Sequence, residues 1–265
     1  MRYFIQLSYD GSAYHGWQVQ DNSSSVQELI EQGLKFKAGL NNRVTGCGRT
    51  DAGVHARQFF AHFDLLKRLD EIELKDLCGA LNHFLPKDIA IQKIFMVRPD
   101  AHCRFDAKSR TYKYYISRVK DPFIRNNSWY YSAPLDIDRM VEASKVLFDY
   151  EDFTSFSKLH TDVKTNNCKI SQADWTEARG QLIFTITADR FLRNMVRAIV
   201  GTLLNVGKGK LTLESFRKVI ESKDRANAGF SVPARGLFLD GVEYNWVEIK
   251  GRGPRLGISK PIFFR

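Results

Sequence analysis

The segment GCGRTDAGVHA, residues 46–56, places three glycines around a single acid, Asp51, with Arg49 two residues before it. Aspartate before Ala-Gly is common in ordinary turns, so one interpretation is a simple bend. Gly53, however, permits a positive φ, which lets an acid project from a tight loop. The segment also precedes a strand-like run at 57–65, and loops held by a rigid scaffold often carry function. The segment therefore predicts either a turn or a reaction centre at Asp51.

The pattern of apolar residues predicts strands and helices in both halves of the chain. Alternation predicts half-buried antiparallel strands at 2–10, 57–65, 88–97, 111–119, 169–178, 182–188 and 237–244. Helical spacing with capping residues predicts helices at 24–39, 74–85, 136–150, 190–209 and 212–222. The first half ends near residue 108, and no Pro- or Ser-rich linker follows it. We expect an α+β fold whose two halves pack as one body.

Composition excludes several classes of protein. The chain has 265 residues, of which 43% are hydrophobic, enough for one large core or two medium ones. No apolar run approaches the roughly 18 residues that span a bilayer, and residues 1–10 lack a signal-peptide cleavage site. The four cysteines and six histidines show no disulfide or metal-ligand spacing, and we expect His55 and His62 to be core residues. These features predict a soluble, cytoplasmic protein without bound metal.

The net charge of +10 is concentrated in the second half. Residues 110–265 contain 26 Lys and Arg against 17 Asp and Glu, whereas residues 1–109 contain 14 against 13. The densest segments are 109–125, where basic residues alternate with three tyrosines, and the tail 250–265, which has five basic residues and no acid. Phosphate-neutralising groups beside aromatic rings favour RNA binding. The simpler alternative is charge that serves solubility.

The helix expected at 190–209 carries Arg190, Arg193 and Arg197, a spacing that predicts one stripe of arginines. A solvated basic face is the simpler interpretation of such a stripe. Arg197, however, has apolar neighbours on both sides in the sequence. A guanidinium buried there needs an anionic partner, because an unpaired buried charge is costly. We expect that partner to be Asp51.

The segment GRTDAGVHA (48–56) resembles the signature of the tRNA pseudouridine synthase A family. Other blocks resemble the same family in the same order, so that the resemblance spans nearly the whole chain. They are YDGSAYHGWQVQ (9–20), SVQELIEQGL (25–34), CRFDAKSRTYKYYI (103–116), FLRNMVRAIVG (191–201) and PARGLFL (233–239).

The resemblance implies a fold of two pseudo-symmetric α/β domains, residues 1–108 and 109–265. Each would have an antiparallel sheet with helices on one face, and the two would flank a basic active-site cleft. The resemblance also implies a homodimer that isomerises uridine to pseudouridine in the anticodon stem-loop of tRNA, at positions 38, 39 and/or 40, with no cofactor and no metal.

Matched residue by residue, the resemblance makes Asp51 the catalytic aspartate and Tyr112 the active-site tyrosine. It makes Arg49 the guanidinium that enters the RNA stem, and Arg197 the partner of the aspartate. The reaction loses no atom, so an anionic oxygen at the sugar–base junction, acting as nucleophile or base, meets its main need. The alternatives are that Tyr112 only packs in a strand and that Arg49 is only an ion-pair partner of Asp51.

Other function classes explain the sequence less well. An RNA-binding module without catalysis would account for the basic half and the tyrosines, but not for the Asp51 loop. A hydrolase with Cys47 or Asp51 as nucleophile lacks a histidine–acid pair at a suggestive spacing. A phosphate-binding glycine loop would need a motif that does not follow Gly48.

Overall fold

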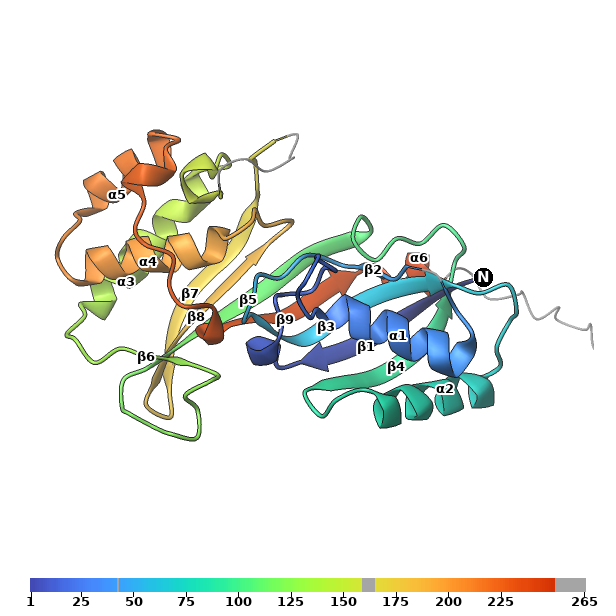
Figure 1. Cartoon of the computed structure of the whole chain (residues 1–265). Helices are drawn as coiled ribbons and strands as arrows, with labels where there is room; N and C mark the ends of the chain where they lie inside the picture. The colour runs from blue at the N-terminus through green and yellow to red at the C-terminus, as the bar shows by residue number, and fades with distance from the viewer. Residues whose placement is uncertain (42, 159–164, 251–265) are drawn as a thin grey trace, which may run out of the picture.

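The computed structural model describes residues 1–41, 43–158 and 165–250, where nine strands form one mixed sheet (Figure 1). The strand order is β4-β1-β3-β9-β5-β8-β7, with β2 beside β3 and β6 beside β5. The α+β class is confirmed. The basic tail, apart from Lys250, lies outside the described residues.

The predicted strands and helices occur in the predicted order, and the structure adds three short elements that were not predicted, β2, β6 and α6. The first half contains β1 (Arg2–Tyr9), α1 (Val26–Ala38), β2 (Thr45–Gly46), β3 (His55–Asp64), α2 (Glu71–Phe84) and β4 (Ile89–Val97). The second contains β5 (Ala107–Ser117), β6 (Trp129–Tyr130), α3 (Ile137–Val146), β7 (Ile170–Ala178), β8 (Gln181–Ala188), α4 (Met195–Gly207), α5 (Leu213–Glu221), β9 (Leu237–Tyr244) and α6 (Trp246–Lys250). Figure 1 shows α1 and α2 beside the first-half strands, and α3, α4 and α5 beside β7 and β8.

Capping residues set the ends of α1 and the start of α2. The Ser25 side chain accepts a hydrogen bond from the Glu28 amide at the start of α1, and Gly39 ends that helix with φ of 68°. Helix α2 begins three residues earlier than predicted, because Asp70 and Glu73 form a capping box.

The predicted helix 190–209 is wrong at its start. Asn194 has φ of 68°, a left-handed conformation that an α-helix cannot include, so α4 begins at Met195. Arg190 and Arg193 therefore precede the helix, and Arg197 is the member of the expected stripe that lies on it. The arginines do not form one helical face.

Strand β9 joins the two halves of the molecule. It pairs in parallel with β3 and antiparallel with β5, so the two expected antiparallel sheets are one continuous sheet. Each half has its own core, but Leu239 and Tyr244 of β9 pack in the first-half core. In return, Val54 of the first half packs in the second-half core. Hydrogen bonds and apolar contacts thus cross the proposed division at residue 108.

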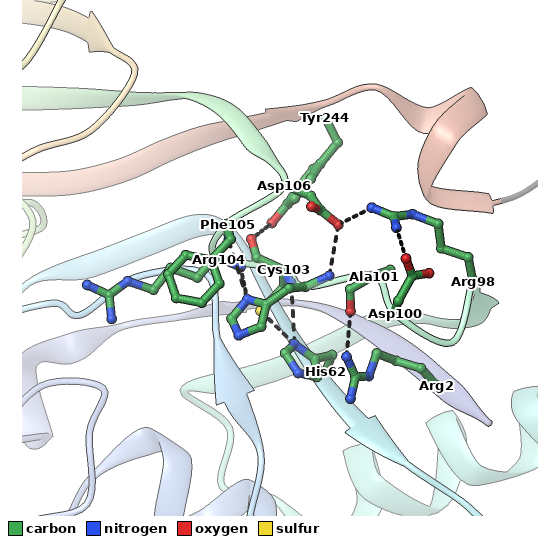
Figure 2. A network of polar contacts seen from close by, with 11 residues as sticks. Arg2, His62, Arg98, Asp100, Ala101, Cys103, Arg104, Phe105, Asp106 and Tyr244 are labelled. Carbon is green, nitrogen blue, oxygen red and sulfur yellow. Dashed lines mark hydrogen bonds and ion pairs between the residues drawn. The ribbon is translucent and has the colours of Figure 1, made fainter.

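A polar network fixes the segment between β4 and β5, residues 98–106 (Figure 2). Arg98 pairs with Asp106 at 2.7 Å, and the Tyr244 hydroxyl donates to the Cys103 carbonyl. His62 Nδ1 lies 3.3 Å from the Cys103 amide, which donates to it. Because His62 lies on β3 and Tyr244 on β9, their hydrogen bonds tie the segment to the sheet.

Two absences apply to residues 1–41, 43–158 and 165–250. No helix there is long and apolar enough to cross a bilayer. No group of three His, Cys, Asp or Glu side chains is placed to hold a metal ion in that same part of the chain.

Because the folded chain favours neutral His62, we expect the protein to lose stability as the pH falls. Burial, together with the positive charge of Arg2, lowers the pKa of His62 from 6.5 to about 4. Between these values the unfolded chain binds a proton that the folded chain excludes. The contribution of His62 is therefore present above pH 6.5 and is lost as the pH falls towards 4. We expect the melting temperature to fall between pH 7 and pH 5, and to fall less in His62→Gln. Equal falls in both proteins would contradict this assignment.

Candidate active site

Asp51 begins a tight turn between β2 and β3. The Val54 amide donates to the Asp51 carbonyl at 3.1 Å, and Gly53 within the turn has φ of 75°. A residue other than glycine would be strained at that position. The conformation that the sequence predicted for Gly53 is therefore present, and it lets the Asp51 side chain project from the turn.

The segment 9–20 packs directly against this turn. The Gly53 amide donates to the Tyr14 carbonyl at 3.1 Å, and the Tyr9 hydroxyl is 2.9 Å from Thr50 Oγ1. Gly16 has φ of 94°, and a Cβ placed on it would lie 2.2 Å from the Thr50 carbonyl oxygen. The turn is thus held by a backbone approach that a side chain at position 16 would prevent.

His55, the first residue of β3, joins three separate segments beside the turn. Its Nδ1 accepts from the Gly11 amide at 3.1 Å, and its Nε2 lies 3.1 Å from the carbonyls of both Asn126 and Arg235. Nδ1 also lies 3.0 Å from Asp10 Oδ1, so residues 10 and 11 both contact this ring nitrogen. The side chain is only 1% exposed, so His55 is a core residue, as expected.

The Asp51 carboxylate lies between two guanidinium groups of the second half. Asp51 Oδ2 is 3.5 Å from Arg197 Nη1, and Oδ1 is 3.6 Å from Arg193 Nε. Arg197 also donates from Nε to the Val232 carbonyl at 2.7 Å, which fixes its position. The expected contact between Arg197 and Asp51 is present. The sequence named Arg193 but missed its contact with Asp51, because it placed Arg193 on the helix.

Tyr112 lies on β5, at the centre of the sheet, and packs against both cores. Its ring meets the Phe191 ring edge-on at 5.1 Å. Burial raises the pKa of Tyr112 well above its usual value, and the negative charge of Asp51 acts in the same direction. The phenol is therefore protonated at neutral pH. Two residues on, Tyr114 is fully buried and donates to the Pro233 carbonyl.

Arg49 is exposed on the segment that leads into the Asp51 turn. Within the described part of the chain, the ion pairs of Asp51 are those with Arg193 and Arg197, and Arg49 forms none with it. The alternative that Arg49 is simply a salt-bridge partner of Asp51 is therefore wrong. Its guanidinium forms no ion pair with any residue that the structure describes.

Cys47, the other candidate nucleophile in the segment, is unsuited to that role. It is 1% exposed, and burial raises its pKa to about 11. The thiol therefore stays protonated near neutral pH, and the thiolate is the nucleophilic form. This chemistry disfavours a cysteine hydrolase.

Known proteins similar to this chain agree on one family. A family model described as tRNA pseudouridine synthase matches residues 6–106 and 146–245. A protein from Bacteroides thetaiotaomicron named tRNA pseudouridine synthase A is 57% identical over 246 residues, covering 92% of this chain and 90% of that protein. A protein of the same name from Clostridium acetobutylicum is 42% identical, covering 91% of this chain and 98% of that protein. The matched ranges contain Arg49, Asp51 and Arg197, whereas Tyr112 lies between them.

The close approach at Gly16 gives a test of how the Asp51 turn is held. Gly16→Ala would press a methyl group on the Thr50 carbonyl and strain a positive φ. We expect a loss of stability of about 2 kcal/mol, seen as a lower melting temperature. Gly48→Ala is the matched control, because a Cβ there meets nothing within 4 Å, and it should melt with the wild type. A Gly16→Ala protein as stable as Gly48→Ala would refute the role of this contact.

Proposed function

The chain belongs to the tRNA pseudouridine synthase family, and we propose that it isomerises uridine to pseudouridine in the anticodon arm of tRNA. The modified positions would be 38, 39 and/or 40, and Asp51 would be the catalytic residue. One observation carries this proposal: a carboxylate on a rigid turn of one half faces two guanidinium groups of the other. An RNA-binding surface alone gains nothing from a carboxylate, because it repels phosphate.

The reaction requires one bond to break and another to form at the same carbon. The C1′–N1 bond of uridine breaks, the uracil turns over, and C5 bonds to C1′. C5 then gives up its proton, and N1 gains one, so the atoms balance. Asp51 would act at the ribose, either as nucleophile at C1′ or as the base that helps to split the glycosidic bond.

The two arginines suit this role of Asp51. Their distances to its oxygens, 3.5 and 3.6 Å, are within the range of ion pairs, so two positive charges face the carboxylate. No described residue donates a hydrogen bond to either oxygen, so their lone pairs remain open to a ribose. Arg197, with a side chain 19% exposed, would orient the carboxylate. Arg193, with a side chain 58% exposed, would be able to leave Asp51 and contact RNA instead.

Tyr112 and Arg49 would handle the base and the stem. The protonated phenol of Tyr112 has no hydrogen-bond partner among the described residues, which leaves it available to an everted uracil. Extrusion of a base costs a few kcal/mol, and exposed Arg49 would occupy the gap or bind the flanking phosphate.

The larger organisation is part of the same proposal. The halves 1–108 and 109–265 would act as two domains around a basic cleft, in a cytoplasmic homodimer whose partner is tRNA. The charge surplus after residue 109 supports the polyanionic partner.

Asp51→Asn tests the catalytic role. Asparagine keeps the shape of the side chain and removes the charge that the reaction needs. We expect kcat to fall by at least about 10³-fold, measured as tritium release from tRNA containing [5-³H]uridine. tRNA binding should be retained. Asp174→Asn, an exposed change on β7, is the matched control and should keep full activity. Tritium release by Asp51→Asn at the wild-type rate would exclude this residue from the chemistry.

Arg197→Lys tests whether orientation of the carboxylate matters beyond charge. One lysine nitrogen cannot contact both the Val232 carbonyl and Asp51, as the Arg197 guanidinium does. We expect kcat to fall about 10²-fold with KM changed only a few-fold. Arg193→Lys should lose less, because Arg193 is exposed and has no side-chain hydrogen bond with a described residue. Full kcat in Arg197→Lys would contradict the orienting role.

A further inference from the structure

Four arginines gather beside the Asp51 turn, and one of them holds the backbone around the other three. Arg110 Nη1 donates to the carbonyls of Asp189, at 2.8 Å, and of Ala107. Its Nη2 donates to the carbonyls of Cys47, at 3.2 Å, and of Arg104. The carbonyls of Cys47, Arg104 and Asp189 lie at or within two residues of Arg49, Arg104 and Arg190. One guanidinium thus brings three separate segments, from both halves, to one place.

The positive charge of this cluster is not neutralised within the described residues. None of the four arginines forms an ion pair with a described carboxylate. The nearest acid in the sequence, Asp189, uses Oδ1 to accept from the backbone amides of Lys169 and Arg190. The carbonyls around Arg110 are neutral. Like charges held together without counter-charge repel one another, so the cluster is stabilised when an anion binds.

The charges of these side chains act on one another. Burial lowers the pKa of Arg104, and the positive charges of Arg49, Arg110 and Arg190 lower it further. This agrees with the backbone contacts of Arg110, which place the four residues together.

Arg104 is presented by a rigid segment. Figure 2 shows its side chain pointing away from the polar network that ties residues 98–106 to the sheet. His102 Nδ1 accepts from the backbone amides of Arg104 and Phe105, and the guanidinium lies 5.8 Å from the centre of the Phe105 ring. Arg104 therefore has a fixed backbone and an aromatic support, while its donors stay free of other described residues.

We propose that Arg49, Arg104 and Arg190, held together by Arg110, form a binding site for backbone phosphates of the RNA strand that carries the reacting uridine. Planar guanidinium groups bind phosphate oxygens in pairs, and several positive charges in one place suit a strand of phosphates better than a single carboxylate. The site adjoins the Asp51 turn through the contact of Arg110 with Cys47. The inference rests on the proposed function, since it takes tRNA as the ligand. In this site Arg110 is a positioning residue, and Arg104 and Arg190 touch the strand.

The test is the salt dependence of tRNA binding in an Asp51→Asn background, where the substrate is not consumed. Arg104→Ala and Arg190→Ala are each compared with the parent, using an unmodified tRNA transcript over a series of KCl concentrations. Each lost phosphate contact should weaken binding about 10-fold at low salt and reduce the slope of log Kd against log [KCl] by about 1. Arg110 is not substituted, because its loss would free the three backbone segments that it holds.

Arg68→Ala is the matched control. It removes the same charge from an exposed residue beyond the opposite end of β3, without breaking an ion pair between described residues. It should leave the slope unchanged. If Arg104→Ala and Arg190→Ala match Arg68→Ala, the phosphate site is refuted, whatever the catalytic activity. If they flatten the slope while wild-type protein releases no tritium from [5-³H]uridine, the site stands and the proposed function fails.

Discussion

The contact between the Asp51 carboxylate and the Arg197 guanidinium joins two halves of the chain that are far apart in sequence. At 3.5 Å, with both side chains mostly shielded from solvent, a Coulomb attraction of order 4 kcal/mol at an effective dielectric near 20 offsets the cost of removing the two charges from water. The pair is useful chemically only if both partners are held still. The carboxylate receives no hydrogen bond from a described residue. Its position therefore depends on how the surrounding backbone is held.

Each partner is held by backbone rather than by side-chain packing alone. On the first half, Gly16 and Gly11 allow segment 9–20 to approach the Asp51 turn at distances that a Cβ would forbid. On the second half, Arg197 donates to the Val232 carbonyl. Strand β9 then fixes the halves to each other, because it pairs with β3 and with β5. The geometry of the pair follows from the continuity of the sheet.

The arginines around Arg110 differ from many other arginines of the described chain in having no carboxylate partner there. Many surface arginines, such as Arg2 and Arg217, have carboxylate partners at 2.8 Å. Arg110 instead donates to backbone carbonyls, which fix its position without cancelling its charge. Positive potential is therefore preserved beside the Asp51 carboxylate, the arrangement that the proposed reaction on an RNA strand would need.

The sequence by itself determined the order of strands and helices, the positive φ of Gly53 and the pairing of Arg197 with Asp51. Each follows from local patterning, from the freedom of glycine or from the cost of an unpaired buried charge. It misplaced the start of α4, because nothing local shows that Asn194 adopts a left-handed conformation. The contact of Arg193 with Asp51, the sharing of β9 and the gathering of arginines around Arg110 were decided by tertiary structure alone. These contacts join residues scores of positions apart, and a local pattern carries no information about which distant segment the folded chain brings alongside.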